Sequence, residues 1–172
     1  MNKIQSTLSN NTISSNSQEA FSLNEKAIFG ERVGDKIQYS LSEALFLAQE
    51  GKMEVLSKNK KISNKELLKK LQRIDKKIEI KSLVFNDLRK KGYIPKTALK
   101  FGADFRVYDK GTKPGISHAK WIVFVDYESR KISWHEFSAK NRVAHSTKKN
   151  LLLAIVDEEG DIIYYEIKWL KP

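Results

Sequence analysis

Residues 104–109, Asp-Phe-Arg-Val-Tyr-Asp, alternate between polar and apolar side chains and decide the architecture of the second half of the chain. Successive side chains of a strand point to opposite faces, so Arg106 and Tyr108 share one face while Phe105 and Val107 share the other. Upstream of this stretch the apolar residues recur at helical spacing. The change of period predicts an α+β protein with a small α/β domain followed by a β-rich domain.

The alternating pattern continues to the end of the chain. It predicts further strands over 118–127, 131–137, 151–157 and 161–169, and a short helix over 138–149. The acidic segment Asp157-Glu158-Glu159-Gly160-Asp161 is typical of a hairpin turn.

The first half carries helix-start signals. Ser40 with Glu43 and Ser63 with Glu66 are capping-box pairs, and they predict helices over 40–51 and 63–78; a third helix is expected over 80–91. Short apolar pieces between glycines predict strands within 21–38. Residues 1–19 are rich in Ser, Asn and Gln, which predicts a flexible tail. The change from helical to alternating period predicts an N-terminal domain over 20–78 and a C-terminal domain over 79–172.

Charge and composition restrict the function. Among 172 residues, 32 are basic and 21 acidic, and the formal charge of +11 favours phosphate-bearing partners; the alternative is that the lysines merely solvate helix faces. Cysteine is absent, which excludes disulfides, thiolate metal sites and cysteine nucleophiles. The glycines form no phosphate-binding loop, so neither ATP nor a dinucleotide is expected.

No apolar run approaches the ~18–20 residues of a membrane span. The N-terminus also lacks the basic and then apolar layout of a signal peptide. We therefore expect a cytoplasmic protein without membrane partners.

Several polar side chains are candidates for chemistry. Tyr108 lies near the end of one predicted strand and His118 begins the next, so the two flank a turn and could converge at its mouth. His135 and His145 remain open as structural or RNA-contacting residues, because their local sequence does not distinguish these roles.

Four ordered stretches carry a family resemblance: Lys100–Tyr108 (KFGADFRVY), Ser117–Lys120 (SHAK), Arg142–Lys149 (RVAHSTKK) and Leu152–Asp157 (LLAIVD) continuing to Tyr164-Tyr165. The chain resembles the catalytic subunit of archaeal tRNA-splicing endonucleases over most of residues 92–172. The resemblance is weaker over the residues before 92. The resemblance of residues 92–172 implies a restriction-endonuclease-like catalytic domain that removes introns from precursor tRNA by cutting at bulge-helix-bulge sites.

The family uses a tyrosine, a histidine and a lysine without metal, and these fall on Tyr108, His118 and Lys149. Lys148 is a competing position for the lysine. Attack by the RNA 2′-hydroxyl needs a base, an acid on the departing 5′-oxygen and a cation near phosphorus; Tyr108, His118 and Lys149 would supply them in that order. The products would be 2′,3′-cyclic phosphate and 5′-hydroxyl ends, and no cofactor is expected.

Further contacts follow from the same resemblance. Arg142 matches an arginine that stacks on a flipped bulge base, although no second arginine stands at a matching position. We expect Lys148 and His145 to contact RNA beside it.

Two rival functions remain. Asp161, Glu166 and Lys168 imitate the acidic and lysine motif of metal-dependent nucleases. Alternatively, the chain is an RNA-binding or structural subunit without chemistry.

Assembly is also implied. In the resembling family an acidic hairpin turn enters a basic groove on a neighbouring subunit, which predicts an interface at Asp157, Glu158, Glu159 and Asp161. The partner would be precursor tRNA together with either further copies of this chain or a structural paralogue in a two-plus-two assembly.

Overall fold

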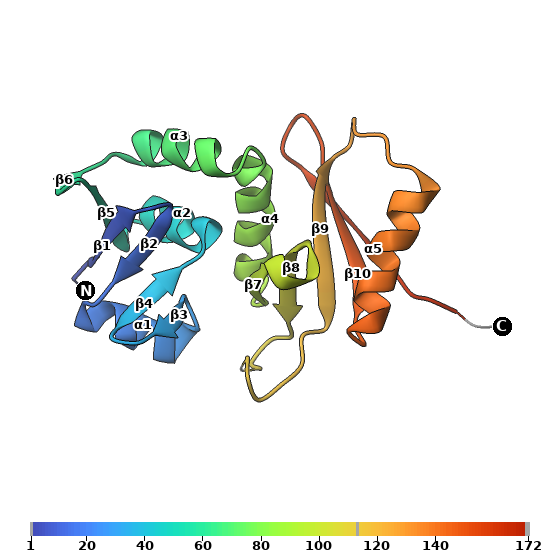
Figure 1. Cartoon of the computed structure of the whole chain (residues 1–172), viewed down its shortest axis with the longest axis horizontal. Coiled ribbons are helices and arrows are strands. Elements are labelled where there is room, and N and C mark those ends of the chain that lie inside the picture. Colours follow the sequence, from blue (N-terminus) through green and yellow to red (C-terminus); the bar gives the residue numbers. More distant parts are fainter. Residues whose placement is uncertain (1, 113, 171–172) are drawn as a thin grey trace. The chain divides into compact units, whose positions relative to one another are not determined.

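The computed structural model describes residues 2–112 and 114–170, which form two compact units divided between Phe85 and Asn86 (Figure 1). Each unit contains one mixed β-sheet with helices packed on it. The predicted α+β class, with a small α/β unit followed by a β-rich one, is confirmed. Among the described residues no helix is long and apolar enough to cross a membrane.

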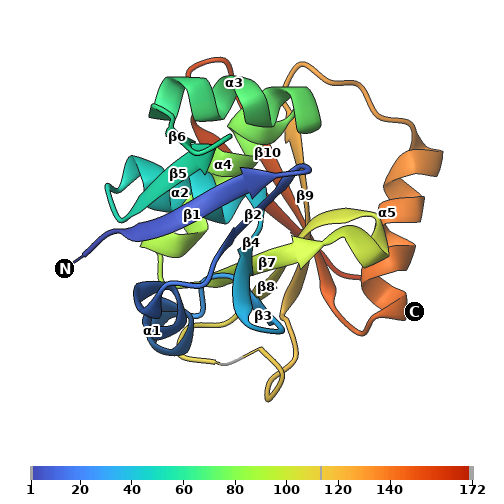
Figure 2. The same cartoon turned by 60° about the vertical axis from the view of Figure 1, so that its left-hand side comes forward.

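The first unit is built on a six-stranded sheet in the order β3-β4-β2-β1-β5-β6. Strands β1 and β5 run parallel, and the other neighbours are antiparallel (Figure 2). The strands are β1 (Ile4–Ser9), β2 (Thr12–Ser15), β3 (Glu31–Val33), β4 (Lys36–Tyr39), β5 (Met53–Ser57) and β6 (Lys60–Lys61).

Three helices of this unit begin after a serine whose hydroxyl accepts a backbone N–H. They are α1 (Gln18–Ala27), α2 (Leu41–Gln49) and α3 (Asn64–Ile74), capped by Ser17, Ser40 and Ser63. The two predicted capping boxes are present, with the Glu43 and Glu66 carboxylates accepting from the cap N–H groups. The predicted strands within 21–38 are right only after residue 30, because the preceding residues belong to α1.

The expectation of a flexible tail was wrong. Strands β1 and β2 lie inside the sheet and bury Ile4 and Ile13. Ser6 and Ser15 of these strands are also buried: Ser15 Oγ donates to the Gln5 carbonyl at 2.5 Å, and Ser6 Oγ donates to the Glu54 carbonyl at 3.1 Å. A polar composition concealed these strands, since a serine that bonds to a neighbouring strand is buried at little cost.

The second unit holds a five-stranded sheet in the order β11-β10-β9-β8-β7. Its strands are β7 (Ile94–Ala98), β8 (Ala103–Tyr108), β9 (Trp121–Tyr127), β10 (Asn150–Val156) and β11 (Ile162–Ile167), with a 3₁₀ turn at Leu99–Phe101. Strands β9 and β10 are parallel and the other pairs antiparallel. Helix α5 (Trp134–Ser146) covers one face of β9 and β10 around Ile122, Ala144 and Leu151 (Figure 1).

Two sequence expectations fail in this unit. The predicted strand over 131–137 does not form, because Ser133 caps α5 by accepting from the Glu136 N–H at 3.1 Å and the helix begins at Trp134. Strand β7 was not predicted, since Pro95 and Lys96 interrupt its pattern. Proline is tolerated there because β7 is an edge strand.

Helix α4 (Ile78–Lys90) contains the division between the units. Val84 and Phe85 are buried, and the Phe85 ring meets the Phe46 ring edge-on in the first unit. Asp87 instead accepts a hydrogen bond from the Tyr164 hydroxyl of β11 at 2.7 Å. The domain boundary expected from the sequence, at residue 79, lies at the start of α4. The two compact units divide later, between Phe85 and Asn86 within the same helix.

Candidate active site

Strand register brings the three candidate catalytic residues to one end of the second sheet. Because β8 runs antiparallel to β9 and β9 parallel to β10, the end of β8 meets the starts of β9 and β10. The Lys120 N–H donates to the Val107 carbonyl at 2.8 Å, and the Asn150 N–H donates to the Lys120 carbonyl at 3.2 Å. Tyr108 and Lys149 adjoin these bonded residues, and His118 lies two residues before Lys120. We call this region the polar end of the second sheet.

Tyr108 is the last residue of β8 and is only 5% exposed. Arg106 shares its face of the strand, with the guanidinium carbon 6.0 Å from the centre of the Tyr108 ring. Arg106 is therefore part of the electrostatic surroundings of Tyr108.

His118 is exposed in the segment between β8 and β9. A turn begins this segment, with the Thr112 hydroxyl donating to the Asp109 carbonyl at 2.7 Å, and Lys120 lies 4.0 Å from the Asp109 carboxylate. The imidazole is thus open to a ligand while both ends of its segment are tied to β8 and β9. The predicted strand start at His118 was early, since β9 begins at Trp121.

Lys149 lies where α5 gives way to β10. Its N–H donates to the Ala144 carbonyl at 2.9 Å, and its ammonium donates to the Thr147 carbonyl at 2.7 Å. Burial, and then repulsion from Arg106, lower the pKa of the Lys149 ammonium. Lys149 is thus half-buried, fixed and close to a second cation.

Lys148 differs from its neighbour although only one residue separates them. It is exposed, and its φ of 56° places it in the left-handed region that L side chains rarely adopt. That conformation reverses the chain after α5 and positions Lys149. The contrast favours Lys149 for chemistry and leaves Lys148 at the surface.

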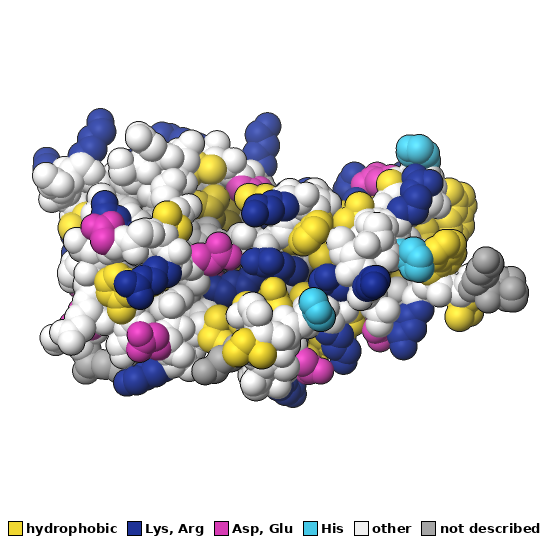
Figure 3. Space-filling view, turned by 60° about the horizontal axis from the view of Figure 1, so that its bottom comes forward, with side chains coloured by type: hydrophobic (Ala, Val, Ile, Leu, Met, Phe, Trp, Pro, Cys, Tyr) yellow, Lys and Arg dark blue, Asp and Glu magenta, His cyan; other side chains and the backbone are white. Residues whose placement is uncertain are grey.

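Arg142 and His145, which were predicted to contact RNA, lie on α5, and so does His135, whose role the sequence left open. Arg142 is exposed, and so is His135 in the first turn. The His145 ring meets the Trp169 ring edge-on at 4.0 Å, so one side of this histidine packs against an aromatic residue. Figure 3 shows basic and histidine side chains together on one exposed face of this unit.

The acidic hairpin turn joins β10 to β11, as predicted from the sequence. Asp157 acts within the turn, because its carboxylate accepts from the N–H groups of Glu159 and Asp161, both at 2.9 Å. Glu158, Glu159 and Asp161 are exposed, and the part of the chain that the structure describes provides no cation within ion-pair distance of them. Three of the four predicted interface carboxylates are therefore available to a partner.

The residues of the metal-nuclease alternative do not form one site. Asp161 precedes β11 and Glu166 lies near its far end. Glu166 Oε1 accepts from Trp121 Nε1 at 3.1 Å and from Asn150 Nδ2 at 2.6 Å, and these two bonds lower the pKa of the Glu166 carboxyl. Its position ties β9, β10 and β11 together, and residues 2–112 and 114–170 contain no cluster of three His, Asp or Glu side chains suited to a metal.

Sequence reasoning missed two parts of this region. It placed Arg106 beside Tyr108 without assigning it a role, and it gave no role to the Trp121, Asn150 and Glu166 cluster. The signal for Arg106 was its position two residues before Tyr108 on one strand face. The cluster left no local signal, because Trp121 and Glu166 are 45 residues apart.

Comparison with known proteins identifies the class to which this fold and site belong. The family model of the tRNA intron endonuclease catalytic C-terminal domain matches residues 78–164, and that of the N-terminal domain matches residues 4–68. The chain belongs to the tRNA intron endonuclease family, as the sequence resemblance predicted.

Among curated proteins, the chain is 43% identical over 160 residues to a tRNA-splicing endonuclease of Thermococcus onnurineus, covering 88% of this chain and 92% of the relative. It is 43% identical over 152 residues to that of Nanoarchaeum equitans, covering 84% of this chain and 97% of the relative. A tRNA-splicing endonuclease of Methanothermobacter thermautotrophicus is 39% identical over 150 residues, 87% of each chain. Family and relatives together support a tRNA-splicing endonuclease function.

Proposed function

We propose that this chain is a catalytic tRNA-splicing endonuclease that cuts precursor tRNA at bulge-helix-bulge sites with Tyr108, His118 and Lys149. The observation that carries the proposal is the register of β8, β9 and β10, which brings these three residue types to one end of one sheet. Precursor tRNA is the expected partner, and the net charge of +11 suits an RNA substrate.

The proposed reaction is a transesterification within the RNA. Tyr108 accepts the proton of the 2′-hydroxyl, whose oxygen attacks the adjacent phosphorus, and the bond from phosphorus to the 5′-oxygen breaks. Protonated His118 donates its proton to that leaving oxygen. Lys149 stabilises the negative charge that develops on the phosphoryl oxygens. The products are a 2′,3′-cyclic phosphate and a 5′-hydroxyl end, and no metal takes part in these steps.

The environment of each residue supports its assigned role. A tyrosine that accepts a proton is assisted by nearby positive charge, and the guanidinium carbon of Arg106 lies 6.0 Å from the centre of the Tyr108 ring. Exposed His118 retains freedom to reach the leaving group. Lys149 is held by the Thr147 carbonyl, which limits the reorganisation needed when charge develops.

RNA binding and assembly complete the proposal. Exposed Arg142 is suited to stack on a flipped bulge base. His145 lies on the same helix and Lys148 follows its end, and both would contact RNA beside Arg142. The carboxylates of Glu158, Glu159 and Asp161 dock into a basic groove of another subunit, either a second copy or a structural paralogue. Complementary charge of this kind specifies the partner more than it adds affinity.

The deciding experiment is cleavage of a bulge-helix-bulge RNA by the purified protein, alone and with a candidate structural subunit, in excess chelator. We expect cleavage at the two bulges, with 2′,3′-cyclic phosphate and 5′-hydroxyl ends identified by mass spectrometry of the fragments. Products with 5′-phosphate ends, or activity that requires added magnesium, would contradict the mechanism. Binding without cleavage would favour the non-catalytic subunit.

A further inference from the structure

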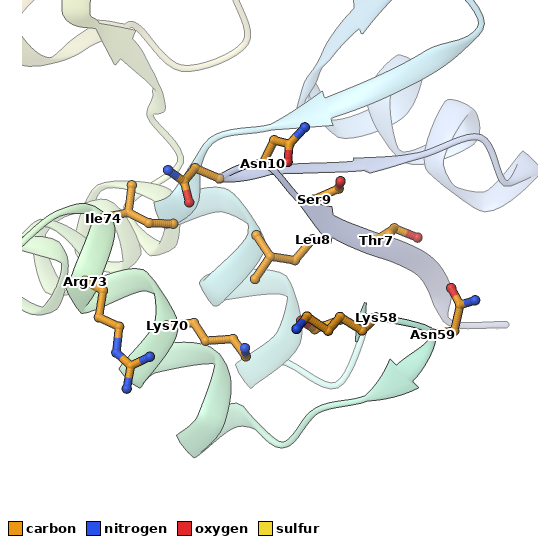
Figure 4. A pocket seen from close by; sticks show the side chains of 11 residues that line it. Thr7, Leu8, Ser9, Asn10, Lys58, Asn59, Lys70, Arg73 and Ile74 are labelled. Carbon is orange, nitrogen blue, oxygen red and sulfur yellow. The ribbon is translucent and has the colours of Figure 1, made fainter.

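A basic groove lies within the first unit, and none of the residues assigned above lines it. It is formed by the β1–β2 turn, the β5–β6 turn and one face of α3, and its volume is about 530 Å³ (Figure 4). We call it the α3 groove. Its cations are Lys58, Lys70 and Arg73, and no carboxylate lines it.

Strand pairing places the two turns side by side. β1 runs parallel to β5 with Leu8 opposite Ser57, so the turn after Ser9 and the turn after Ser57 leave the sheet at the same end. Lys70 and Arg73, three residues apart on α3, face the same space. The groove is thus built by three elements from separate parts of the sequence.

The two turns have the same backbone shape but different residues. Asn10 and Asn11 have φ of 48° and 63°, and Lys58 and Asn59 have φ of 52° and 61°, as in two-residue turns with both central residues left-handed. Asparagine tolerates this region, whereas lysine does so at a cost. The first turn shows that this fold accepts asparagine there, so a lysine at position 58 is not required by the turn.

The cations of the groove are available to a ligand. Among residues 2–112 and 114–170, no carboxylate lies within ion-pair distance of Lys58, Lys70 or Arg73. Glu66, one helical turn before Lys70, interacts with Lys70 through charge but forms no ion pair with it, and its carboxylate accepts hydrogen bonds from the N–H and hydroxyl of Ser63. A group of cations without an ion-paired carboxylate attracts anions.

The lining indicates which anion fits. Beside the three cations it consists mainly of serine, threonine and asparagine, with two large aliphatic residues, Leu8 and Ile74, and no aromatic residue. Lys, Arg, Ser, Thr and Asn are the side chains that contact nucleic-acid phosphates, whereas the centres of protein interfaces are depleted in charge and rich in aromatic anchors.

We infer that the α3 groove binds phosphates of the RNA substrate and gives the first unit a direct part in substrate affinity. The inference rests on the proposed function, in that RNA is the ligand. Contacts of this kind act through charge, so they raise the affinity for RNA of any sequence to a similar degree. They leave the rate of the chemical step unchanged.

The test compares two variants of equal charge. Lys70→Gln/Arg73→Gln removes two groove cations, and Lys69→Gln/Lys76→Gln removes two exposed cations of the same segment that do not line the groove. With an intron-containing precursor tRNA transcript, we expect the groove variant to bind about tenfold more weakly and its salt slope to fall by about 2, one for each phosphate contact. Its KM rises and its kcat is unchanged, while the control resembles wild type.

A third variant separates charge from folding. Lys58→Asn reproduces the residues of the β1–β2 turn, so its melting temperature should not fall, yet it should weaken RNA binding. Equal RNA affinity and salt slope in the groove and control variants would overturn the inference while leaving cleavage by wild type intact. If light scattering showed that the groove variant no longer assembles, and its loss of RNA binding followed from that loss of assembly, the groove would be a binding site for a protein segment. That result would also overturn the inference. Failure of wild type to cleave would instead defeat the proposed function, and groove-dependent RNA binding would still be measurable.

Discussion

At the polar end of the second sheet, Lys149 is half-buried and its ammonium bonds to a carbonyl 2.7 Å away, whereas in the α3 groove Lys58 and Arg73 are exposed. Burial, and then repulsion from Arg106, lower the pKa of Lys149, while the groove cations lie on two separate elements, the β5–β6 turn and α3. A fixed cation in a partly dry site suits the stabilisation of a transition state. Exposed cations suit the attraction of a polyanion, and mutations should therefore affect rate in one region and affinity in the other.

The largest effect is expected from His118→Ala. Loss of a positioned general acid should lower the cleavage rate by roughly 10²–10⁴ and leave RNA affinity nearly unchanged. Single-turnover cleavage and filter binding on the same RNA measure the two quantities. His135→Ala and His145→Ala are the controls, and a comparable rate loss in either, with His118→Ala near wild type, would show that the wrong histidine was chosen.

The next test separates the two adjacent lysines. Lys149→Gln should lower the single-turnover rate by roughly 10²–10³, because it removes the cation that we propose stabilises the developing charge. Lys148→Asn keeps a residue that tolerates the left-handed backbone and should change the rate only slightly. If the two results were exchanged, the catalytic lysine would be Lys148.

Assembly provides the third test. Glu158→Lys/Glu159→Lys reverses two exposed carboxylates of the acidic turn and keeps Asp157, which holds the turn by accepting two N–H groups. We expect the four-subunit particle to be lost, a dimer to remain and cleavage to weaken. Light scattering with and without the candidate partner measures the number of subunits in the particle.

The control for that test is Glu50→Lys/Glu128→Lys, which makes the same charge change at two exposed positions outside the turn. It should leave assembly intact. A four-subunit particle of normal activity in the Glu158→Lys/Glu159→Lys protein would assign the acidic turn no role beyond its hairpin.

The smallest expected effect concerns the Lys149 titration. Burial and Arg106 both disfavour the charged ammonium, so its pKa lies below the ordinary value of 10.5, and the positive charge is lost at a lower pH than in a free lysine. Arg106→Gln removes the second cause and should move the pKa back toward 10.5. An NMR titration of the Lys149 side chain measures the change, with Arg142→Gln as the control. An unchanged Lys149 pKa in the Arg106→Gln protein would show that Arg106 has no electrostatic effect on Lys149.

The sequence by itself determined the features that depend on neighbouring residues. The Ser40 and Ser63 capping boxes, the alternation around Tyr108 and the acidic hairpin turn were all predicted, because each is formed by residues within a few positions of one another. Ordered motifs carried the family and the candidates Tyr108, His118 and Lys149.

Tertiary structure decided the features whose partners are distant along the chain. Ser6 and Ser15 are buried in strands only because carbonyls of neighbouring strands accept their hydroxyls. Glu166 is tied to Trp121 across 45 positions, and the α3 groove exists because parallel pairing of β1 with β5 brings two turns beside α3. A sequence pattern records which side chains are polar, whereas burial, hydrogen bonding and the grouping of cations depend on which strands become neighbours.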